Sequence, residues 1–425
     1  TGSLFHRHYF LPSKRPSTVI EWINSPQQSL DLIERIKASK SAFIGLDTEF
    51  VRRSSFFADP GLLQISWNDG KTHVALVDLV NLKQKAIRHL LHCLYTLSRD
   101  QQATLVMHAP AEDLQIFDYY GLERDFELII DTQIAACFCT EQQQISLTEL
   151  TRQLLPHHQV QPSMAQSNWL QRPLSWAELA YAAEDAALLY ELAIKLKKQL
   201  SEEDYNRVLQ DSKAVYKTWH LFVASQPYAR FQSSMSKIPR PLQARLAHLI
   251  SWRERAVREL NIPRKWHLTD DALIALAKLG DIDAPPKMQS ILSLFYHSAA
   301  KMKDRFKLKS ESKDLFLASL DIPDLHDEFY QAWQELAPYP EYLVPARLNK
   351  NSKVTLELLE KEANNYARKN NIPPHAFMRK AWLKQLMQAH KKQLKGLEEP
   401  IHAIFTTWRQ GFMVKAKSIM LQHPY

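Results

Sequence analysis

Two carboxylates, Asp47 and Glu49, stand in the segment FIGLDTEFVRR, residues 43–53, directly after a run of apolar residues. The apolar run predicts a strand that enters a core, and side chains two residues apart in a strand point to the same face. Asp47 and Glu49 would then lie side by side and repel each other. A positively charged partner is needed to hold them there.

Three further acids are candidates to join this pair. Asp113 lies in VMHAPAEDLQIF, just after a predicted strand and in the first turns of a predicted helix. Taken alone, Asp113 is an acid that complements a helix N-terminus. Asp185 lies in LAYAAEDAALLYEL, four residues after Tyr181, so both share one face of a helix. This helix is rich in Ala and Leu and predicted to be buried, and an acid there needs a salt-bridge partner or a metal. The third candidate is Asp131, in IDTQ.

A cluster of carboxylates from separate elements suits Mg²⁺ or Mn²⁺, which prefer oxygen ligands. Two such ions about 3.5–4 Å apart can clamp an in-line displacement at phosphorus. One ion activates the attacking water and the other stabilises the leaving oxygen. Tyr181 would stand beside that water. Because its unperturbed pKa is about 10, it is expected to orient the water rather than deprotonate it, unless the metal ions lower that pKa.

The elements that must position these residues follow a mixed α/β pattern. Strands are predicted at 41–50, 61–68 and 73–80, where polar turns favour a meander, and a short strand is predicted at 104–109. Helices are predicted at 25–39, 84–97 and 110–121, and two more begin at capping boxes, Ser146 with Glu149 and Ser175 with Glu178. This α/β domain is expected to end between residues 200 and 215.

Strand signals fade in the second half of the chain, and residues 216–239 are predicted to be a linker. The remainder is helical and contains an internal repeat. RAVRELNIPRKW surrounds Asn261 and NYARKNNIPPHA surrounds Asn371, 110 residues later. The repeat predicts two related helical modules in which Asn-Ile-Pro connects one helix to the next.

Composition sets the remaining limits. A chain of 425 residues predicts two or three domains, and its formal charge of +8 is unevenly spread. Residues 1–200 hold 19 Lys and Arg against 22 Asp and Glu, and residues 201–425 hold 35 against 24. A basic second half is expected of a protein with a polyanionic partner, although composition alone fits an ordinary Lys-rich surface equally well. Three Cys, no long apolar run and no secretory signal predict a cytoplasmic protein without a membrane span.

The motifs DTEF, HAPAED and YAAED, in this order and spacing, resemble the three exonuclease motifs of the DEDD superfamily. With a Tyr four residues before the last Asp, the chain resembles the tyrosine subgroup of this superfamily. Together with GLLQIS, IDTQIAA and NWLQRPL, these motifs resemble the ribonuclease D family. PRPLQARLAHLISWRERAVRELNIP resembles the helicase-and-RNase-D C-terminal (HRDC) domain, of which bacterial family members carry two.

The resemblance implies a fold class and a domain order. An α/β exonuclease domain of the ribonuclease H-like type, with a mixed sheet and flanking helices, is expected at residues 17–215. Two small all-α HRDC domains are expected after the linker, at 240–320 and 321–425.

The resemblance also implies roles for single residues. Asp47, Glu49, Asp113 and Asp185 match the acids that bind two divalent cations, Mg²⁺ or Mn²⁺, and Tyr181 matches the tyrosine that positions water.

Three other residues receive weaker assignments. Asp131 matches a motif residue outside the metal set and is interpreted as a helix cap or ion-pair partner. Phe50 and His108 flank the motifs and are expected to contact the terminal nucleotide.

The segment QPSMAQSNWLQRPL departs from the family, which often has charged residues, including a Lys, before the WL motif. The departure concerns substrate contacts, because all five catalytic positions are intact.

The implied function is a monomeric 3′→5′ exoribonuclease that trims tRNA precursors and other structured RNAs with a single-stranded 3′ end, releasing nucleoside 5′-monophosphates. A DNA exonuclease is the first alternative, because the same core serves DNA proofreading. The chain has no P-loop of a helicase. A nucleic-acid-binding protein with an inactive core is the second alternative, and it would require a lost acid where none is lost.

Overall fold

The computed structural model describes the greater part of the chain. The described residues are 18–52, 54–121, 127–158, 162–217, 231, 238–279, 285–293, 311–334, 350–393, 405 and 407–423. The chain divides into two compact units, one made of residues 1–51, 58–219 and 351–425, the other of residues 52–57 and 220–350. Most of the predicted linker, 216–239, lies outside the described residues.

Six strands form one mixed sheet in the order β1-β4-β3-β2-β5-β6. The strands are β1 (Thr18–Ile23), β2 (Phe43–Val51), β3 (Asp59–Asn68), β4 (Thr72–Asp78), β5 (Thr104–Met107) and β6 (Ile129–Asp131). Strands β2, β3 and β4 form the predicted antiparallel meander, while the pairs β1–β4, β2–β5 and β5–β6 are parallel. The sequence patterns had not predicted β1.

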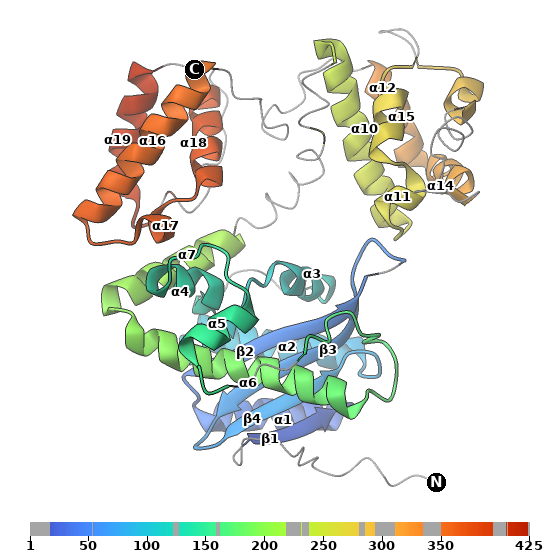
Figure 1. Ribbon diagram of the computed structural model, residues 1–425. Helices are drawn as coiled ribbons and strands as arrows, with labels where there is room; N and C mark the ends of the chain where they lie inside the picture. The colour runs from blue at the N-terminus through green and yellow to red at the C-terminus, as the bar shows by residue number, and fades with distance from the viewer. Residues whose placement is uncertain are drawn as a thin grey trace, which may run out of the picture. The chain divides into compact units, whose positions relative to one another are not determined.

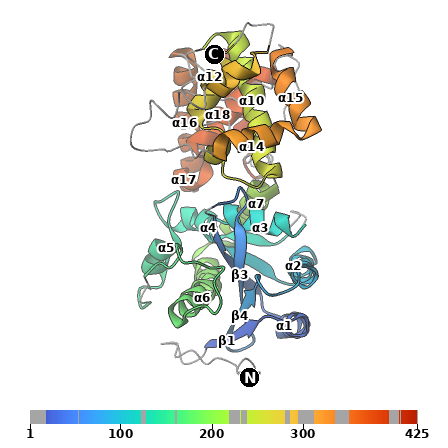
Figure 2. The ribbon, with the colours of Figure 1, turned by 90° about the vertical axis from the view of Figure 1, so that its right-hand side faces the viewer.

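Helices cover both faces of this sheet. Figure 2 shows α1 (Pro26–Ser39) and α2 (Gln84–Arg99) on one side, with α5 (Leu147–Leu154) and α6 (Trp176–Gln199) on the other. Three more helices complete this part: α3 (Ala111–Tyr119), α4 (Thr132–Cys139) and α7 (Glu202–Lys217). The expected α/β fold, a mixed sheet with flanking helices, is confirmed.

Local sequence signals set the helix starts. Ser175 and Glu178 form the complete predicted capping box of α6. At α5, the Ser146 side chain accepts a hydrogen bond from the Glu149 amide, but the Glu149 carboxylate accepts from Arg152 and Gln153. The capping box predicted at Ser146 therefore forms only its first half.

Helix α6 lies across β2, β3 and β4 (Figure 1). It approaches the sheet closely at Gly45. A Cβ on Gly45 would lie 3.0 Å from the Ala186 carbonyl oxygen and 2.3 Å from the Ser66 hydroxyl. Ser66 donates a 2.6 Å hydrogen bond to that carbonyl, which ties the helix to β3. The absence of a side chain at Gly45 lets the turn of α6 that carries Asp185 reach the strand that carries Asp47.

The second half of the chain is helical where it is described. The helices are α10 (Arg240–Glu259), α11 (Arg264–His267), α12 (Asp270–Ala277), α14 (Glu311–Leu320), α15 (Pro323–Gln334), α16 (Lys350–Lys369), α17 (Pro374–Phe377), α18 (Lys380–Gln393) and α19 (Gln410–Gln422). Helices α10, α11 and α12 begin 110 residues before α16, α17 and α18, which is the offset of the sequence repeat. Asn261 and Asn371 both adopt a left-handed conformation, with φ of 47° and 54°, between the first two helices of each set. The predicted helix-to-helix connection is thus confirmed.

One hydrophobic cluster extends from Phe231 to Trp333 and includes residues of α10, α12, α14 and α15. It includes Trp252 of α10, Phe316 of α14 and Phe329 of α15, whose rings pack against one another. The boundary expected between residues 320 and 321 cuts through this cluster, because α15 packs on α10. We call residues 350–423 the C-terminal module; α16, α18 and α19 lie alongside one another there (Figure 1).

Among the described residues, no helix is both long and apolar enough to cross a membrane.

Candidate active site

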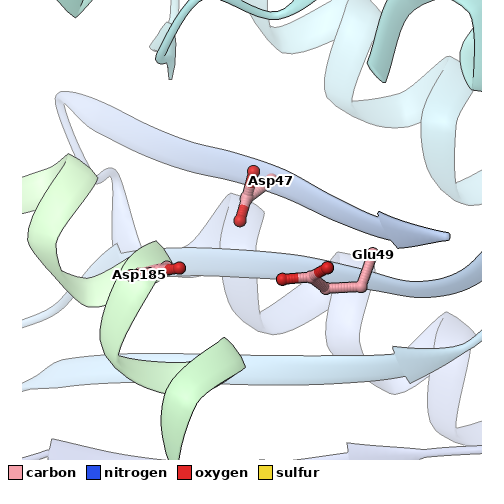
Figure 3. A group of neighbouring side chains, drawn as sticks. All are labelled: Asp47, Glu49 and Asp185. Atoms are coloured by element: carbon pink, nitrogen blue, oxygen red, sulfur yellow. The ribbon is translucent and has the colours of Figure 1, made fainter. Parts of the chain in front are cut away.

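Three carboxylates that are distant in the sequence meet at the middle of the sheet. Asp47 and Glu49 come from β2, and Asp185 comes from α6, which lies over that strand (Figure 3). One oxygen of each side chain lies within 4.8 Å of the others. The predicted pair and the predicted helical acid therefore form one cluster.

Asp113 approaches from a third element, the first turn of α3, and is buried. Its Oδ1 accepts a hydrogen bond of 2.5 Å from the Thr48 hydroxyl. Thr48 stands between Asp47 and Glu49 on β2, so the strand that provides two acids also holds the fourth. Sequence reasoning missed this role of Thr48, for which the only signal is a polar residue between two acids.

Burial and mutual repulsion disfavour the charged forms of these acids. Burial, followed by the charges of Asp113, Asp185 and Glu49, raises the pKa of Asp47 well above its ordinary value. Burial and the charges of Asp185 and Asp113 raise the pKa of Glu49 to about 8. Burial raises the pKa values of Asp113 and Asp185 to about 6. A bound cation would relieve this repulsion, because opposite charge favours the ionised carboxylate.

Tyr181 lies one helical turn before Asp185 and is hydrogen-bonded to it. Burial, followed by the charges of Asp185 and Glu49, raises the pKa of the Tyr181 hydroxyl. The hydroxyl therefore stays protonated near neutral pH in the cation-free site. Trp169 packs against the ring, with centroids 6.2 Å apart.

A cavity of about 400 Å³ opens over the acids. All seven residues predicted for the site line it: Asp47, Glu49, Phe50, His108, Asp113, Tyr181 and Asp185. Ser163 and Gln166 also line it, and both come from the segment in which the sequence departs from the family. Neither residue had been predicted to belong to the site.

His108 is oriented by the protein. Burial lowers its pKa, so the ring is neutral near pH 7. Nε2 lies 3.0 Å from the carbonyl oxygen of Ile145, which can only accept, and Nδ1 lies 2.8 Å from the hydroxyl of Thr132. The neutral ring thus donates from Nε2 and accepts at Nδ1. Contact with a nucleotide by His108 stays a prediction, and it would use the ring face rather than a nitrogen.

Asp131 is a helix cap, which was one of the two roles expected. Its carboxylate accepts a hydrogen bond from the Gln133 amide at the start of α4. It also accepts one from the Ala109 amide and one from the Tyr216 hydroxyl. Asp131 does not line the cavity.

The NWLQRPL motif holds one of the side chains that pack against the site. Arg172 donates to the buried carboxylate of Asp78 at 2.7 Å and to the carbonyl oxygens of Gly61 and Trp169. Trp169 is fully buried and lies close to Gly61. A Cβ added to Gly61 would lie 2.5 Å from the carbonyl oxygen of Trp169. The motif therefore holds the ring against which Tyr181 packs.

The donor set fits a hard divalent cation. It offers carboxylate oxygens from three elements within one cavity, and among the described residues no thiol or imidazole belongs to the cluster of possible ligands. Asp47, Glu49 and Asp185 would hold a first ion, and Asp113 borders the same cavity.

Comparison with known proteins relates this site to nucleases. Residues 20–201 match the sequence profile of a family described as 3'-5' exonuclease. Ribonuclease D of Bartonella henselae is 27% identical over 337 residues, which cover 79% of this chain and 75% of that protein. Ribonuclease D of Shewanella sp. (strain ANA-3) is 30% identical over 257 residues, 60% of this chain and 62% of that protein. The match thus spans less than two thirds of the length of the Shewanella protein.

A solved structure shares the fold. The crystal structure of Escherichia coli RNase D, described as an exoribonuclease involved in structured RNA processing, superposes with a TM-score of 0.70 at 21% identity. The superposition covers 96% of this chain and 100% of that one. The α/β domain with a helical C-terminal region is therefore a known architecture, and residues 20–201 are related to 3'-5' exonuclease domains.

Proposed function

We propose that this protein is a 3′→5′ exoribonuclease of the ribonuclease D type. It would trim tRNA precursors and other structured RNAs that end in a single-stranded 3′ tail and release nucleoside 5′-monophosphates. The observation that carries the proposal is the cluster of Asp47, Glu49 and Asp185 within 4.8 Å, with Tyr181 on the same helical face as Asp185. The relatives named ribonuclease D support it.

Five residues of the cavity have a catalytic role in this proposal. Asp47, Glu49, Asp113 and Asp185 bind two divalent cations, which supply the charge that activates a water and stabilises the leaving oxygen. Tyr181 keeps its proton and orients that water toward the terminal phosphodiester. Orientation of this kind is a recognised source of rate enhancement.

Further cavity residues would select the substrate. Phe50 and the ring of His108 offer surfaces for the terminal nucleotide. Ser163 and Gln166, from the segment in which the sequence departs from the family, offer polar groups.

The helical modules would hold the folded part of the RNA. Residues 201–425 carry 35 basic against 24 acidic residues, and phosphate contacts make binding strongly salt-dependent. We propose that both modules are of the HRDC type, the first from residue 240 through α15, with its end after Gln334, and the second from α16 onward. We also propose that the protein acts as a cytoplasmic monomer.

The test uses a tRNA-like RNA with a 3′ tail and a matched single-stranded DNA, both labelled at the 5′ end. Each is incubated with Mg²⁺, Mn²⁺ or EDTA, with Asp47→Asn as the inactive control. A ladder that shortens from the 3′ end of RNA, requires the cation and is lost in Asp47→Asn is the expected result.

Two outcomes would contradict the proposal. Faster loss of the DNA would identify a DNA exonuclease. Binding of RNA without cation-dependent shortening of either substrate would identify a binding protein with an idle site.

A further inference from the structure

The C-terminal module is joined to the α/β domain by a buried ion pair. Arg409 is fully buried and its Nη2 donates to Asp211 Oδ2 of α7 at 2.7 Å, while Nη1 donates to Oδ1 of the same carboxylate. Trp408 Nε1 also donates to Asp211, at 2.8 Å. The remaining donors of Arg409 reach the carbonyl oxygens of Phe377 and Ala376 and the hydroxyl of Thr407. A bidentate ion pair in which every donor of the guanidinium has an acceptor fixes the relative geometry of the two side chains as well as neutralising their charge.

Helix α7 connects this ion pair to Asp131. Ser212, next to Asp211, accepts a 3.0 Å hydrogen bond from the Asp131 amide. Tyr216, on the same helix, donates from its hydroxyl to Asp131 Oδ2 at 3.0 Å. Both side chains are buried. Helix α7 therefore holds Asp131 at two points, its backbone amide through Ser212 and its carboxylate through Tyr216.

Asp131 in turn holds the backbone that leads to Asp113. Its Oδ1 accepts from the Ala109 amide at 2.9 Å. Ala109 has a φ of 47°, a conformation that costs energy for a residue with a Cβ and that persists only where the surroundings impose it. Pro110 follows as the N-cap of α3, and Asp113 lies in the first turn of that helix. The position of Asp113 thus depends on the turn at Ala109.

We propose that the C-terminal module sets the catalytic geometry through α7, with Arg409, Asp211, Tyr216 and Asp131 as positioning residues for Asp113. The module has this role in addition to any contact with RNA. The inference rests on the proposed function, since it concerns the cation site of that reaction. Of the residues in this chain of contacts, only Ala109 and Asp113 line the cavity.

The test separates positioning from simple stability. Tyr216→Phe removes one hydroxyl, and Tyr205→Phe, on the same helix and also buried, is the matched control because its hydroxyl is hydrogen-bonded to Thr104. Arg409→Lys keeps the charge and removes the two-pronged geometry. Mn²⁺ binding is measured by calorimetry without RNA, kcat and KM are measured at saturating Mn²⁺, and thermal unfolding shows that each variant is folded.

Tyr216→Phe and Arg409→Lys are expected to weaken Mn²⁺ binding about three- to ten-fold and to lower kcat, with KM unchanged. Their double variant is expected to lose less than the product of the single losses, because both act along one path. Tyr205→Phe should match the parent protein.

Parent-like Mn²⁺ binding in folded Tyr216→Phe would overturn the proposal, and so would a change confined to KM in Arg409→Lys. Because Mn²⁺ binding is read without RNA, it tests the inference even if the parent protein degrades no RNA. In that case the proposed function fails and the positioning of Asp113 is still decided.

Discussion

The hydroxyl of Thr48 donates a hydrogen bond to the carboxylate of Asp113, 65 residues later in the chain, over 2.5 Å. This contact ties the strand that carries Asp47 and Glu49 to the helix that carries the fourth acid. It also lowers the pKa of Asp113 against the stronger effect of burial.

Thr48→Val is therefore expected to raise the pKa of Asp113 above about 6 and to weaken cation binding at neutral pH. Removal of a hydrogen bond to a charged group costs about 1.5–3 kcal/mol, which corresponds to a loss of one to two orders of magnitude in affinity. Titration of activity with Mn²⁺ at pH 7 measures this. Thr96→Val, a change at a half-buried residue of α2, is the control. An unchanged half-saturating Mn²⁺ concentration in Thr48→Val would contradict the assignment.

Tyr181→Phe should lower kcat by about two orders of magnitude, the size of loss that misplacement of a reacting group can cause. Stability should hardly change, because the ring keeps its contact with Trp169. Tyr190→Phe, a second tyrosine on α6, serves as the matched control. Parent-like single-turnover rates in Tyr181→Phe would exclude a role in the reaction.

Glu49 makes the cation-free protein sensitive to pH. Its pKa is raised from 4.5 to about 8 in the folded state, so between these pH values the folded protein holds a proton that the unfolded chain has released. The free energy of unfolding then falls as pH rises through this window and levels off above pH 8.

Glu49→Gln removes the ionisable group and should raise the melting temperature in EDTA at pH 8.5 by several degrees, while at pH 4.5 the two proteins should agree. The parent should recover this difference when Mg²⁺ is added, and the variant should not. Glu34→Gln, a change at an exposed acid of α1, should behave as the parent. If the variant were no more stable than the parent at pH 8.5, the ionised Glu49 carboxylate would not destabilise the folded protein.

Gly45→Ala should push α6 away from β2, because the new Cβ would meet both Ser66 and the backbone of Ala186. Loss of activity and a lower melting temperature are expected, since over-packing of a core costs about 1–3 kcal/mol. Adding Ser66→Ala removes the nearer contact and should restore part of both. If Gly45→Ala alone retained full activity, the close approach of α6 would not matter for the site.

Much of the site could be predicted from the sequence because its signals are local. Strand alternation placed Asp47 and Glu49 on one face, and helical spacing placed Tyr181 with Asp185; both arrangements are found. Apolar periodicity predicted the meander of β2, β3 and β4, and the repeat around Asn261 and Asn371 predicted the helix connections.

Some pairings were not predicted from the sequence patterns. Strand β1 is parallel to β4 at the sheet edge, and its short segment carries no clear alternation. The boundary expected at residues 320 and 321 stays a prediction, and the contact between Phe329 and Trp252 is visible only in the packing. The second half of the Ser146 capping box was lost to Arg152 and Gln153.

The sequence by itself determined which acids this protein has, in what order, and on which kinds of element they lie. It did so because side-chain direction in a strand or helix depends on near neighbours alone. Only the tertiary structure decided that Thr48 holds Asp113, that Gly45 admits α6, and that Arg409 pairs with Asp211 at a separation of 198 residues. These contacts depend on how the elements pack, and no local pattern encodes a partner so far along the chain.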